Sequence, residues 1–258
     1  MPARIVTWNV NGLRAAVSKR FADHVEELKP DVLMLQETRV FPDQLKGDWG
    51  DPPGWSVVWH PHTRPGYAGV STWTRSAQWV VGTGLGDAES GRVLCTRWRK
   101  LTLVNVYLPS GSSSEEAQSR KEDFMRRFLT WSASLAASDD PVIIAGDLNV
   151  AHTADDIWNP TGNKRSSGFL PHERAWFTEL LESGWSDLLR EHVGPGKGPY
   201  SWWSNRGQAR QKDRGWRIDY LLGNAAVAGS VKAAFVHRQG GLDTSDHAPV
   251  VLDLKGRW

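Results

Sequence analysis

The stretch Ile143-Ile144-Ala145-Gly146-Asp147-Leu148-Asn149 decides how this sequence is interpreted. An apolar run reaches a glycine and then presents an acid and an amide two residues apart. Residues two apart in a strand share a face, and at a strand end they project into the loop region where chemistry is usually placed. We therefore expect Asp147 and Asn149 to point at the same ligand. The alternative is an ordinary Asx-type turn, since Gly, Asp and Asn are common turn residues.

Other strand ends repeat this design. The first apolar run of the chain ends in Asn9-Val10-Asn11-Gly12, again with two polar residues two apart. The next apolar run delivers Glu37 at its end, and a later one, 101–107, ends at Tyr107. This repetition favours a shared site over a series of unrelated turns.

The C-terminal part of the chain adds an acid and an imidazole. Asp219 lies in an otherwise apolar strand, and Asp246-His247 immediately precedes the last strand. We expect Asp219 to orient and charge His247, since buried acids fix imidazole tautomers in this way. Taken alone, His247 would more often be a satisfied core or surface histidine, and Asp219 could instead pair with Arg217 or Arg214.

Length and composition are typical of one globular domain. The chain has 258 residues, 40% hydrophobic and 23% charged, and we expect a single domain over residues 1–258. There is no apolar signal segment and no run of about 18 apolar residues, so we expect a cytoplasmic protein with no membrane partner. Nothing in the sequence indicates an obligate dimer, and we expect a monomer. The single cysteine, Cys95, is expected to be a small core residue.

The strand and helix patterns predict an α/β fold of two packed, mostly antiparallel β-sheets flanked by helices. Short β-rich runs follow one another without helices between them, which is typical of antiparallel sheet. These runs are 55–59, 69–74, 79–81, 93–98 and 101–107. Further strands are expected near 200–203, 216–222, 227–236 and 248–254, with helices over 13–28, 114–136 and 171–181 on the outer faces.

The distribution of charge along the chain is more informative about a partner than the net charge. Net charge is only +2, which does not identify a polyanionic partner. Residues 205–217, however, carry five cations against one anion and are flanked by Trp202, Trp203 and Trp216. Cations interleaved with aromatic rings suit phosphates together with bases or sugars. The segment therefore indicates nucleic acid, although a solvated basic loop would have the same composition.

The strand-end residues supply oxygen ligands and one imidazole, without a cysteine cluster. The set is Asn9, Asn11, Glu37, Tyr107, Asp147, Asn149, Asp219, Asp246 and His247. Such ligands suit a hard cation, Mg²⁺ or Mn²⁺, rather than structural zinc. The eight histidines show no His-x-x-x-His spacing, which argues against a zinc enzyme.

These residue types fit the hydrolysis of a phosphodiester. An enzyme must remove on the order of 8 to 23 kcal/mol from the barrier, whereas one general base supplies a factor of about 10² to 10⁴, so several effects must act together. Glu37 is the candidate for the metal and Asp147 for the base. His247, Asn149 and Tyr107 are the candidate donors that hold developing charge.

Short motifs run in order from residue 8 to residue 249. They are Trp8-Asn-Val-Asn-Gly-Leu-Arg-Ala15, Leu35-Gln-Glu-Thr38, Gly91-Arg-Val93, Asn105-Val-Tyr107, Gly146-Asp-Leu-Asn-Val-Ala-His152, Asn159-Pro-x-Gly-Asn-Lys164, Gly168-Phe with Glu173-Arg174, Tyr200-Ser-Trp-Trp203, Gly215-Trp-Arg-Ile-Asp-Tyr220 and Ser245-Asp-His-x-Pro249. Together they resemble the exonuclease III family of apurinic/apyrimidinic endonucleases. The Ser-Asp-His and Gly-Asp-x-Asn pieces alone would indicate only the wider endonuclease, exonuclease and phosphatase superfamily.

The resemblance implies a four-layered α/β sandwich and a reaction. The reaction is Mg²⁺-dependent attack of water on the phosphodiester 5′ to an abasic site, with 3′–5′ exonuclease and 3′-phosphatase side activities. The implied partner is double-stranded DNA with abasic sites or blocked 3′ ends.

The resemblance also assigns roles to residues. Glu37 would be the main metal ligand, with Asn9 and Asn11 beside it and Asp246 at the metal or at a second metal. Asp147 would activate water, and Asn149 and Tyr107 would hold the phosphoryl group. Asp219 would pair with His247. The metal environment as a whole would comprise Asn9, Asn11, Glu37, Asp147, Asn149, Asp246 and His247.

A further set of residues is expected at the DNA. The set is Arg14, Tyr67, Arg92, Asn159 and Asn163 at the backbone, together with Trp202, Trp216 and Arg217. The two tryptophans would wall the pocket for the flipped-out, baseless sugar, whose extrusion costs least because no base must be unpaired.

The sequence departs from the family pattern at three positions. Asn11 replaces the Asp of some relatives and lowers the local negative charge. Ser110 and Ser166 stand where Asn is common, and a hydroxyl reaches less far. These changes bear on substrate preference more than on the reaction.

Two other functions remain open at this point. A phosphodiesterase for inositol phosphates or sphingolipid would fit the core, but it leaves Trp202 and Trp216 without a task. A catalytically inactive DNA-binding relative would be expected to lack Glu37, Asp147 or His247, and all three are present.

Overall fold

The computed structural model describes residues 2–86, 90–256 and 258. Among these residues the strands form two six-stranded sheets. The first sheet has the order β11 (Val231–Val236), β12 (Val250–Leu254), β1 (Ala3–Asn9), β2 (Val32–Gln36), β4 (Val70–Thr74) and β3 (Ser56–His60). The second has the order β5 (Gln78–Gly82), β6 (Val93–Trp98), β7 (Leu101–Tyr107), β8 (Val142–Asp147), β10 (Asp219–Gly223) and β9 (Ser186–Asp187).

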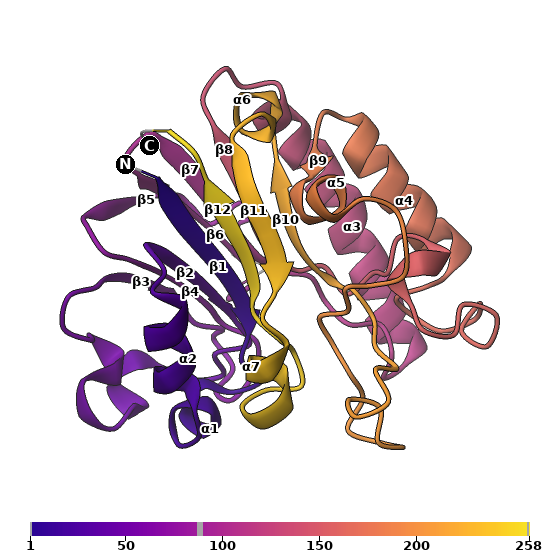
Figure 1. Ribbon diagram of the computed structural model, residues 1–258, viewed down its shortest axis with the longest axis horizontal. Coiled ribbons are helices and arrows are strands. Elements are labelled where there is room, and N and C mark those ends of the chain that lie inside the picture. Colours follow the sequence, from indigo (N-terminus) through magenta and orange to yellow (C-terminus); the bar gives the residue numbers. More distant parts are fainter. Residues whose placement is uncertain (1, 87–89, 257) are drawn as a thin grey trace.

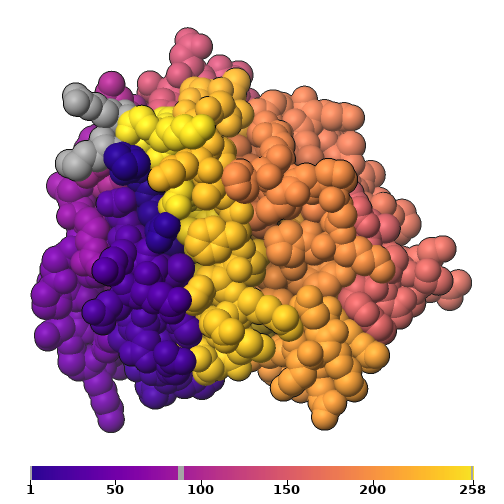
Figure 2. Space-filling model, viewed as in Figure 1, coloured from indigo at the N-terminus to yellow at the C-terminus, as the bar shows by residue number. Residues whose placement is uncertain are grey.

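Each sheet has one parallel pair, and it lies at the centre. These pairs are β1 with β2 and β7 with β8, while the other neighbouring strands are antiparallel. The first and last strands of the chain, β1 and β12, are neighbours, so the two ends of the chain lie side by side on one face (Figure 2). The prediction of two mostly antiparallel sheets is confirmed.

Helices cover the outer face of each sheet (Figure 1). The helices of the described residues are α1 (Leu13–Val17), α2 (Phe21–Leu28), α3 (Glu115–Ala136), α4 (Pro171–Glu182), α5 (Leu188–Val193), α6 (Ala225–Ala228) and α7 (Arg238–Asp243), with 3₁₀ turns at Pro42–Gln44, Gly47–Gly50 and Ala154–Asp156. The two short helices α5 and α6 differ from the others, because their apolar side chains pack between the sheets. Helix α3 begins at an N-cap, since the Ser114 side chain accepts from the Ala117 N–H at 3.1 Å.

Three apolar clusters separate four layers. One joins Val6 and Trp8 of β1 to Phe21 of α2 on the outside of the first sheet. A second lies between the sheets, and a third joins the second sheet to α3 and α4 through residues such as Phe124 and Phe177. Because each sheet buries both of its faces, the molecule is a four-layered α/β sandwich, as the resemblance implied.

Some element boundaries differ from the prediction. The helix expected over 13–28 is two helices, because the chain turns between Val17 and Phe21. The expected strand at 200–203 forms only an isolated bridge at Trp202, and β10 begins at Asp219 rather than 216. The run 227–236 begins inside the short helix α6 before it becomes β11. No helix among the described residues is both long and apolar enough to cross a membrane.

Candidate active site

The central strands carry polar side chains to one edge of the space between the sheets. Ile5 of β1 and Ile143 of β8 belong to the apolar cluster between the sheets. Because side chains alternate along a strand, Asn9 and Asp147, each four residues further on, point to the same side. The Asn9 Nδ2 atom donates to Asp147 Oδ2 at 2.9 Å. The period-two pattern therefore explains why residues from both halves of the chain meet.

Asp147 is held by a set of donors. The Asn149 N–H donates to Asp147 Oδ1 at 2.8 Å, and the Asn149 side chain lies 3.3 Å from Oδ2. Asn9 Nδ2 also donates to Glu37 Oε1 at 2.8 Å, so this amide joins the two carboxylates. Glu37 and Asn149 have positive φ angles of 51° and 50°. Such backbone conformations are uncommon outside glycine and occur preferentially at functional sites.

Gly146 allows Asp147 to reach this place. It has a φ of 146°, and a Cβ at this position would lie 1.9 Å from the Val106 carbonyl oxygen of the neighbouring strand. Only glycine fits so close to another backbone. The glycine that ends the apolar run in the sequence is thus a requirement of the strand packing.

His247 is oriented by Asp219. The His247 Nδ1 atom lies 2.9 Å from Asp219 Oδ2, and Ser201 Oγ donates to the same oxygen at 2.6 Å. A carboxylate at Nδ1 fixes the proton on that nitrogen. Nε2 then faces Asp147 Oδ2, 3.8 Å away. Asp219 does not pair with Arg217, the alternative that the sequence left open.

Burial and neighbouring charge shift the pKa values in this site. Burial, together with Asp219 and Glu37, raises the pKa of Asp147 from 3.8 to about 7, although His247 opposes the shift. Burial would lower the pKa of His247, but the Asp219 charge and hydrogen bond outweigh it and raise the pKa to about 10. At neutral pH the site therefore combines a protonated imidazole with a carboxyl group that can take up or release a proton.

The remaining predicted residues lie around this pair. Burial raises the pKa of Tyr107 well above its usual value, and Glu37, to which its hydroxyl is hydrogen-bonded, adds to the shift. On the other flank, Asn11 Nδ2 donates to Asp246 Oδ1 at 2.8 Å. Burial opposes ionisation of Asp246, but His247 and the Asn11 hydrogen bond lower its pKa below the usual value.

Glu37, Asp147 and His247 form a compact group, in which the two carboxylates could hold a metal ion beside the protonated imidazole. One ligand atom from each lies within 4.8 Å of the others, and all three residues are buried. The Arg39 guanidinium contacts Glu37 directly, which shows that positive charge is favoured at this carboxylate. Asn9 contacts both carboxylates and Asn149 contacts Asp147, whereas Asp246 and Asn11 are hydrogen-bonded to each other beside the group. Two carboxylates with few other ligands suit Mg²⁺ or Mn²⁺.

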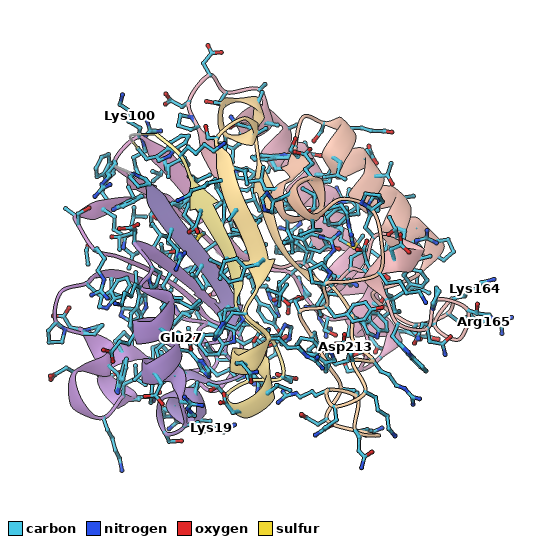
Figure 3. All side chains as sticks on the ribbon, in the orientation of Figure 1. Lys19, Glu27, Lys100, Lys164, Arg165 and Asp213 are labelled. Carbon is cyan, nitrogen blue, oxygen red and sulfur yellow. The ribbon has the colours of Figure 1, made fainter. Side chains whose placement is uncertain are left out.

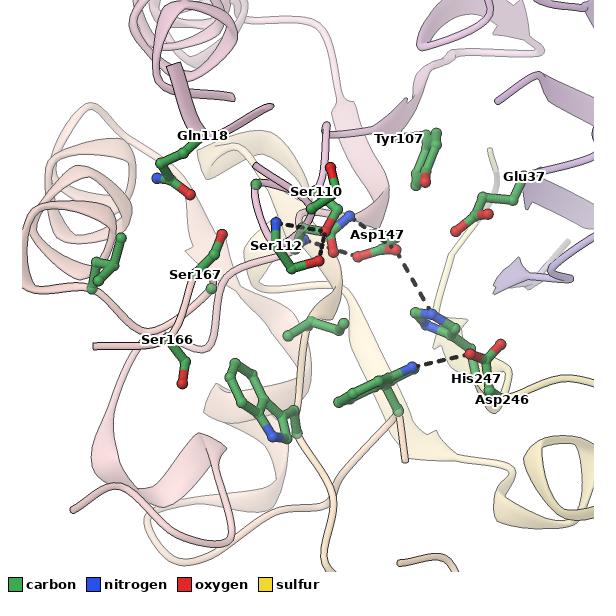
Figure 4. A pocket seen from close by; sticks show the side chains of 18 of the residues that line it. Glu37, Tyr107, Ser110, Ser112, Gln118, Asp147, Ser166, Ser167, Asp246 and His247 are labelled. Atoms are coloured by element: carbon green, nitrogen blue, oxygen red, sulfur yellow. Dashed lines mark hydrogen bonds and ion pairs between the residues drawn. The ribbon is translucent and has the colours of Figure 1, made fainter. Parts of the chain in front are cut away.

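These residues open into a cleft of about 830 Å³. Figure 4 shows Tyr107, Glu37 and Asp147 on one side of it, with His247 and Asp246 close by. Trp202 and Trp216 line the cleft with their rings nearly perpendicular, 89° apart and with centroids separated by 5.9 Å. A carboxylate and imidazole centre beside two aromatic walls can hold a charged phosphate next to an apolar group.

Comparisons with known proteins agree with this geometry. A model of the Endonuclease/Exonuclease/phosphatase family matches residues 6–247. The chain belongs to this family. A *Dictyostelium discoideum* DNA-(apurinic or apyrimidinic site) endonuclease is 36% identical, over 97% of this chain and 71% of the relative. A *Bacillus subtilis* exodeoxyribonuclease is 34% identical, over 96% of this chain and 98% of the relative.

Solved structures of the family have the same fold. A *Neisseria* 3′ phosphatase bound to a product DNA hairpin has a TM-score of 0.89 at 27% identity, covering 98% of this chain and all of that chain. An *Archaeoglobus fulgidus* AP endonuclease also has a TM-score of 0.89, at 25% identity and with the same coverage. The resemblance to the exonuclease III group and the fold class are therefore confirmed.

The expected DNA-binding residues of this family member lie in several places. Asn163, Trp202 and Trp216 line the main cleft. Arg92 donates to the Tyr67 hydroxyl at 2.8 Å, and both line a second cleft. Arg14 is exposed on α1. Asn159 lies in the loop of Asn163, whose Nδ2 donates to the Asn159 carbonyl at 2.8 Å.

Arg217 was wrongly assigned to DNA. Its side chain is 1% exposed and its guanidinium donates to Asp156 at 2.7 Å and to Asp187 at 2.6 Å. A guanidinium enclosed by two carboxylates has no surface to offer a phosphate. The basic segment is instead exposed at Arg206, Lys212 and Arg214.

Several residues of the site were not predicted from the sequence. Arg39 contacts Glu37, and Arg165 lines the cleft from the loop that Figure 3 shows at the molecular surface. Lys121 lies fully buried behind the site, where its Nζ atom donates to the Asn149 carbonyl at 2.8 Å and to Glu173 at 2.6 Å. The position of Lys121 on the otherwise apolar face of α3 was the only sequence feature that indicated its ion pair with Glu173.

Three departures from the family pattern are accommodated locally. Asn11 faces Asp246, as described above. Ser110 lies 3.0 Å from Ser112, and both line the cleft. Ser166 Oγ donates to Asn163 Oδ1 at 3.1 Å, so this hydroxyl positions a cleft residue.

Proposed function

We propose that this protein is a Mg²⁺-dependent DNA-repair phosphodiesterase that cleaves DNA on the 5′ side of abasic sites. The observation that carries the proposal is the convergence of Asp147, His247 and Glu37 at the base of a cleft walled by Trp202 and Trp216. The relatives named for apurinic/apyrimidinic endonuclease and exodeoxyribonuclease activity support it. Either activity is hydrolysis of a DNA phosphodiester, and we infer 3′–5′ exonuclease and 3′-phosphatase activity at the same centre.

Asp147 is the group that orients and deprotonates the attacking water. Burial and the neighbouring carboxylates raise its pKa above that of an ordinary aspartate, which makes it a better proton acceptor. Asn9 and Asn149 fix its position through hydrogen bonds. The bond formed joins the water oxygen to phosphorus, and the bond broken joins phosphorus to the 3′ oxygen of the preceding nucleotide. Asp147 takes a proton from the water, and the departing 3′ oxygen takes a proton from solvent.

His247 holds the charge that develops on the phosphoryl oxygens. Asp219 keeps the imidazole protonated, and its Nε2–H faces the cleft. The Asn149 amide and the Tyr107 hydroxyl, which here contact Asp147 and Glu37, would become further donors where the phosphate replaces those contacts. When bound by Glu37 and its neighbours, Mg²⁺ would supply neutralisation of the phosphate oxygens.

The two tryptophans account for lesion recognition. An abasic sugar has no base to unstack, so it enters a narrow pocket at lower cost than an intact nucleotide. The near-perpendicular rings of Trp202 and Trp216 leave an apolar corner beside the catalytic groups. We infer that the flipped-out sugar lies against these rings.

Further parts of the proposal concern the whole protein. We infer that residues 1–258 form one catalytic domain that acts as a monomer on double-stranded DNA. A DNA-repair function of the bacterial type would place it with chromosomal DNA in the cytoplasm. Mn²⁺ has the same ligand preference as Mg²⁺ and would substitute for it.

A duplex oligonucleotide with one abasic analogue tests the proposal. We expect nicking 5′ to the analogue with Mg²⁺, none with EDTA, and far slower nicking of the matched undamaged duplex. The Glu37→Gln variant should fail to nick, whereas His172→Gln, a change at an exposed histidine outside the cleft, should behave like the wild type. Intact damaged strands after incubation with folded wild-type enzyme and Mg²⁺ would reject the proposal.

A further inference from the structure

A second cluster of ligand-type side chains lies where α2 meets α7. His24 and Glu27 are three residues apart on α2, and His237 precedes α7. Figure 1 shows the two helices side by side, and Figure 3 labels Glu27 at the surface of α2. Among the described residues this group and the group around Glu37 are separate sets that could hold a metal ion.

The three facing atoms are spaced like the ligands of one tetrahedral ion. His24 Nδ1 and His237 Nε2 are 3.1 Å apart. Glu27 Oε2 lies 3.9 Å from the first and 3.7 Å from the second. Zinc bonds of about 2.0 to 2.1 Å place neighbouring ligands of a tetrahedral site roughly 3.3 Å apart. Small movements of the exposed Glu27 side chain bring all three atoms to that spacing.

Asp243 fixes the orientation of the His24 ring. Its Oδ1 atom lies 2.7 Å from His24 Nε2, so the ring carries its proton on that side. The carboxylate is itself held by Arg20 at 3.2 Å and by Thr244 at 2.9 Å. The lone pair of His24 Nδ1 is thereby directed at His237 and Glu27. A histidine that donates its second nitrogen to a carboxylate is the usual arrangement at zinc sites.

A hydrogen bond between the two rings explains only part of this arrangement. A proton on His237 Nε2 would account for the 3.1 Å separation from His24. It leaves the Glu27 carboxylate facing both nitrogens at distances too long for a hydrogen bond. A dication between the three atoms satisfies both lone pairs and the carboxylate, and the single proton of the neutral His237 ring then lies on Nδ1 instead of Nε2.

The surroundings make the group rigid on one side and open on the other. His24 is buried, and its ring packs edge-on against Trp8 at 6.0 Å. The backbone N–H of His237 donates to the Pro249 carbonyl at 2.8 Å. Glu27, by contrast, has a side chain that is 62% exposed, which leaves access for an ion and room for a water ligand.

We propose that His24, His237 and Glu27 bind one transition-metal dication of the Zn²⁺ type, with water as the fourth ligand. Two imidazoles and one carboxylate favour such an ion over Mg²⁺, which prefers oxygen ligands. Bound there, the ion joins α2 to α7. Helix α7 leads directly into residues 244–247, and Trp8, which packs on His24, donates to the His247 carbonyl at 3.0 Å. The proposed ion would therefore stabilise the packing of the segment that carries His247.

The test uses the full-length protein freed of metal by a chelator. We expect tight binding of about one equivalent of Zn²⁺, and a melting temperature that rises by about 5 °C or more when Zn²⁺ is in large excess over its dissociation constant. Co²⁺ should give the visible absorption of a tetrahedral site. Glu37→Gln should retain both signals, because it alters only the catalytic group.

Matched histidine variants separate this site from surface binding. His237→Gln should abolish the Co²⁺ spectrum and the melting shift. His172→Gln, which removes another histidine paired with a glutamate, should leave both unchanged. The proposal is overturned if the wild type gives neither signal, or if His237→Gln retains them.

Glu27→Gln tests the same site without changing a buried histidine, so a folding defect cannot explain its result. The side chain is mostly exposed, so the variant should fold normally and lower the Zn²⁺ affinity at least about tenfold. An unchanged Zn²⁺ affinity in Glu27→Gln would contradict the ligand set. Loss of Zn²⁺ binding in this variant while nicking by the Mg²⁺ enzyme persists would support a site separate from the catalytic one.

Discussion

Two groups of largely buried charged side chains differ in their balance of negative and positive charge. Around the cleft, the carboxylates of Glu37, Asp147, Asp219 and Asp246 face two cations, His247 and Arg39. At the other group, Asp156 and Asp187 face Arg217 and Arg190. The first group has more negative than positive charge, whereas the second is neutral.

The pKa values follow this difference. Burial alone would raise the pKa of Asp156, but Arg217 and Arg190 outweigh it and lower the pKa from 3.8 to about 2. Asp147 is as deeply buried, but the carboxylates of Asp219 and Glu37 lie near it and its cationic neighbour His247 is shared with Asp219, so its pKa rises to about 7. A balanced buried network serves the fold, and an unbalanced one is suited to a cation and to proton transfer. Variants of Asp147 and Asp156 should distinguish buried charge that serves catalysis from buried charge that stabilises the fold.

The largest effect is expected for Asp147→Asn. Nicking should fall at least about 10³-fold because the amide cannot accept the proton of water. DNA binding should change little, since the side chain keeps its size and polarity. Gel-shift and single-turnover measurements check both; equal loss of the two would mean that Asp147 holds structure rather than water.

The unfolding free energy of Asp147→Asn provides a second measurement, and unlike the nicking rate it is not expected to fall. A carboxyl group whose folded pKa is raised destabilises the fold as pH increases from about 4 to about 7. In EDTA at pH 8, Asp147→Asn should therefore be at least as stable as the wild type by urea unfolding. A clear loss of stability would contradict the account of an unbalanced site.

Asp156→Asn should have the reverse effect. Removing the shared carboxylate leaves Arg217 buried with only part of its charge paired, which costs about 3 to 5 kcal/mol of unfolding free energy. The melting temperature should fall by on the order of 10 °C, with nicking per folded molecule nearly unchanged. Asp123→Asn, at an exposed ion pair on α3, is the control and should change stability little. Equal melting temperatures for the two variants would mean that the buried network does not support the fold.

Low pH should weaken the same ion-pair network around Asp156 and so lower the stability of the fold. Because the pKa of Asp156 is lowered from 3.8 to about 2, its contribution is present above pH 4 and is lost as the pH falls from about 4 towards 2. This contribution is about 2 kcal/mol. Urea unfolding from pH 5 to pH 2 should show a steeper loss of stability in the wild type than in Asp156→Asn. Parallel curves would remove Asp156 from the acid response.

The smallest effect is expected for Trp216→Ala. Loss of one aromatic wall should reduce the preference for abasic over undamaged duplex by about tenfold, the size of one stacking contact. Trp79→Ala, at an exposed tryptophan on β5, is the matched control. Undiminished preference in Trp216→Ala would place the abasic sugar elsewhere.

The catalytic centre could be predicted from sequence because it follows the strand period. Apolar runs that end in Asn9, Glu37, Tyr107 and Asp147 mark strand ends, and the alternation of side chains brings them to one face. The runs 93–98 and 101–107 match β6 and β7. Sequence resemblance added the pairing of Asp219 with His247, which spacing alone left open.

Contacts between distant segments could not be predicted in this way. Arg217 looked like part of a basic surface, because composition does not show that Asp156 and Asp187, 61 and 30 residues away, enclose it. The histidine spacing argued against zinc, yet His24 and His237 meet from positions 213 residues apart. The break between α1 and α2 at residues 18–20 contains neither glycine nor proline, so no helix-breaking residue marks it in the sequence.

Anomalous scattering from a crystal soaked in Mn²⁺ tests the central claim most directly. The account predicts a peak in coordinating contact with Glu37, at the group it forms with Asp147 and His247, and loss of that peak in Glu37→Gln. A wild-type crystal with ordered Mn²⁺ elsewhere and none at Glu37 would contradict it.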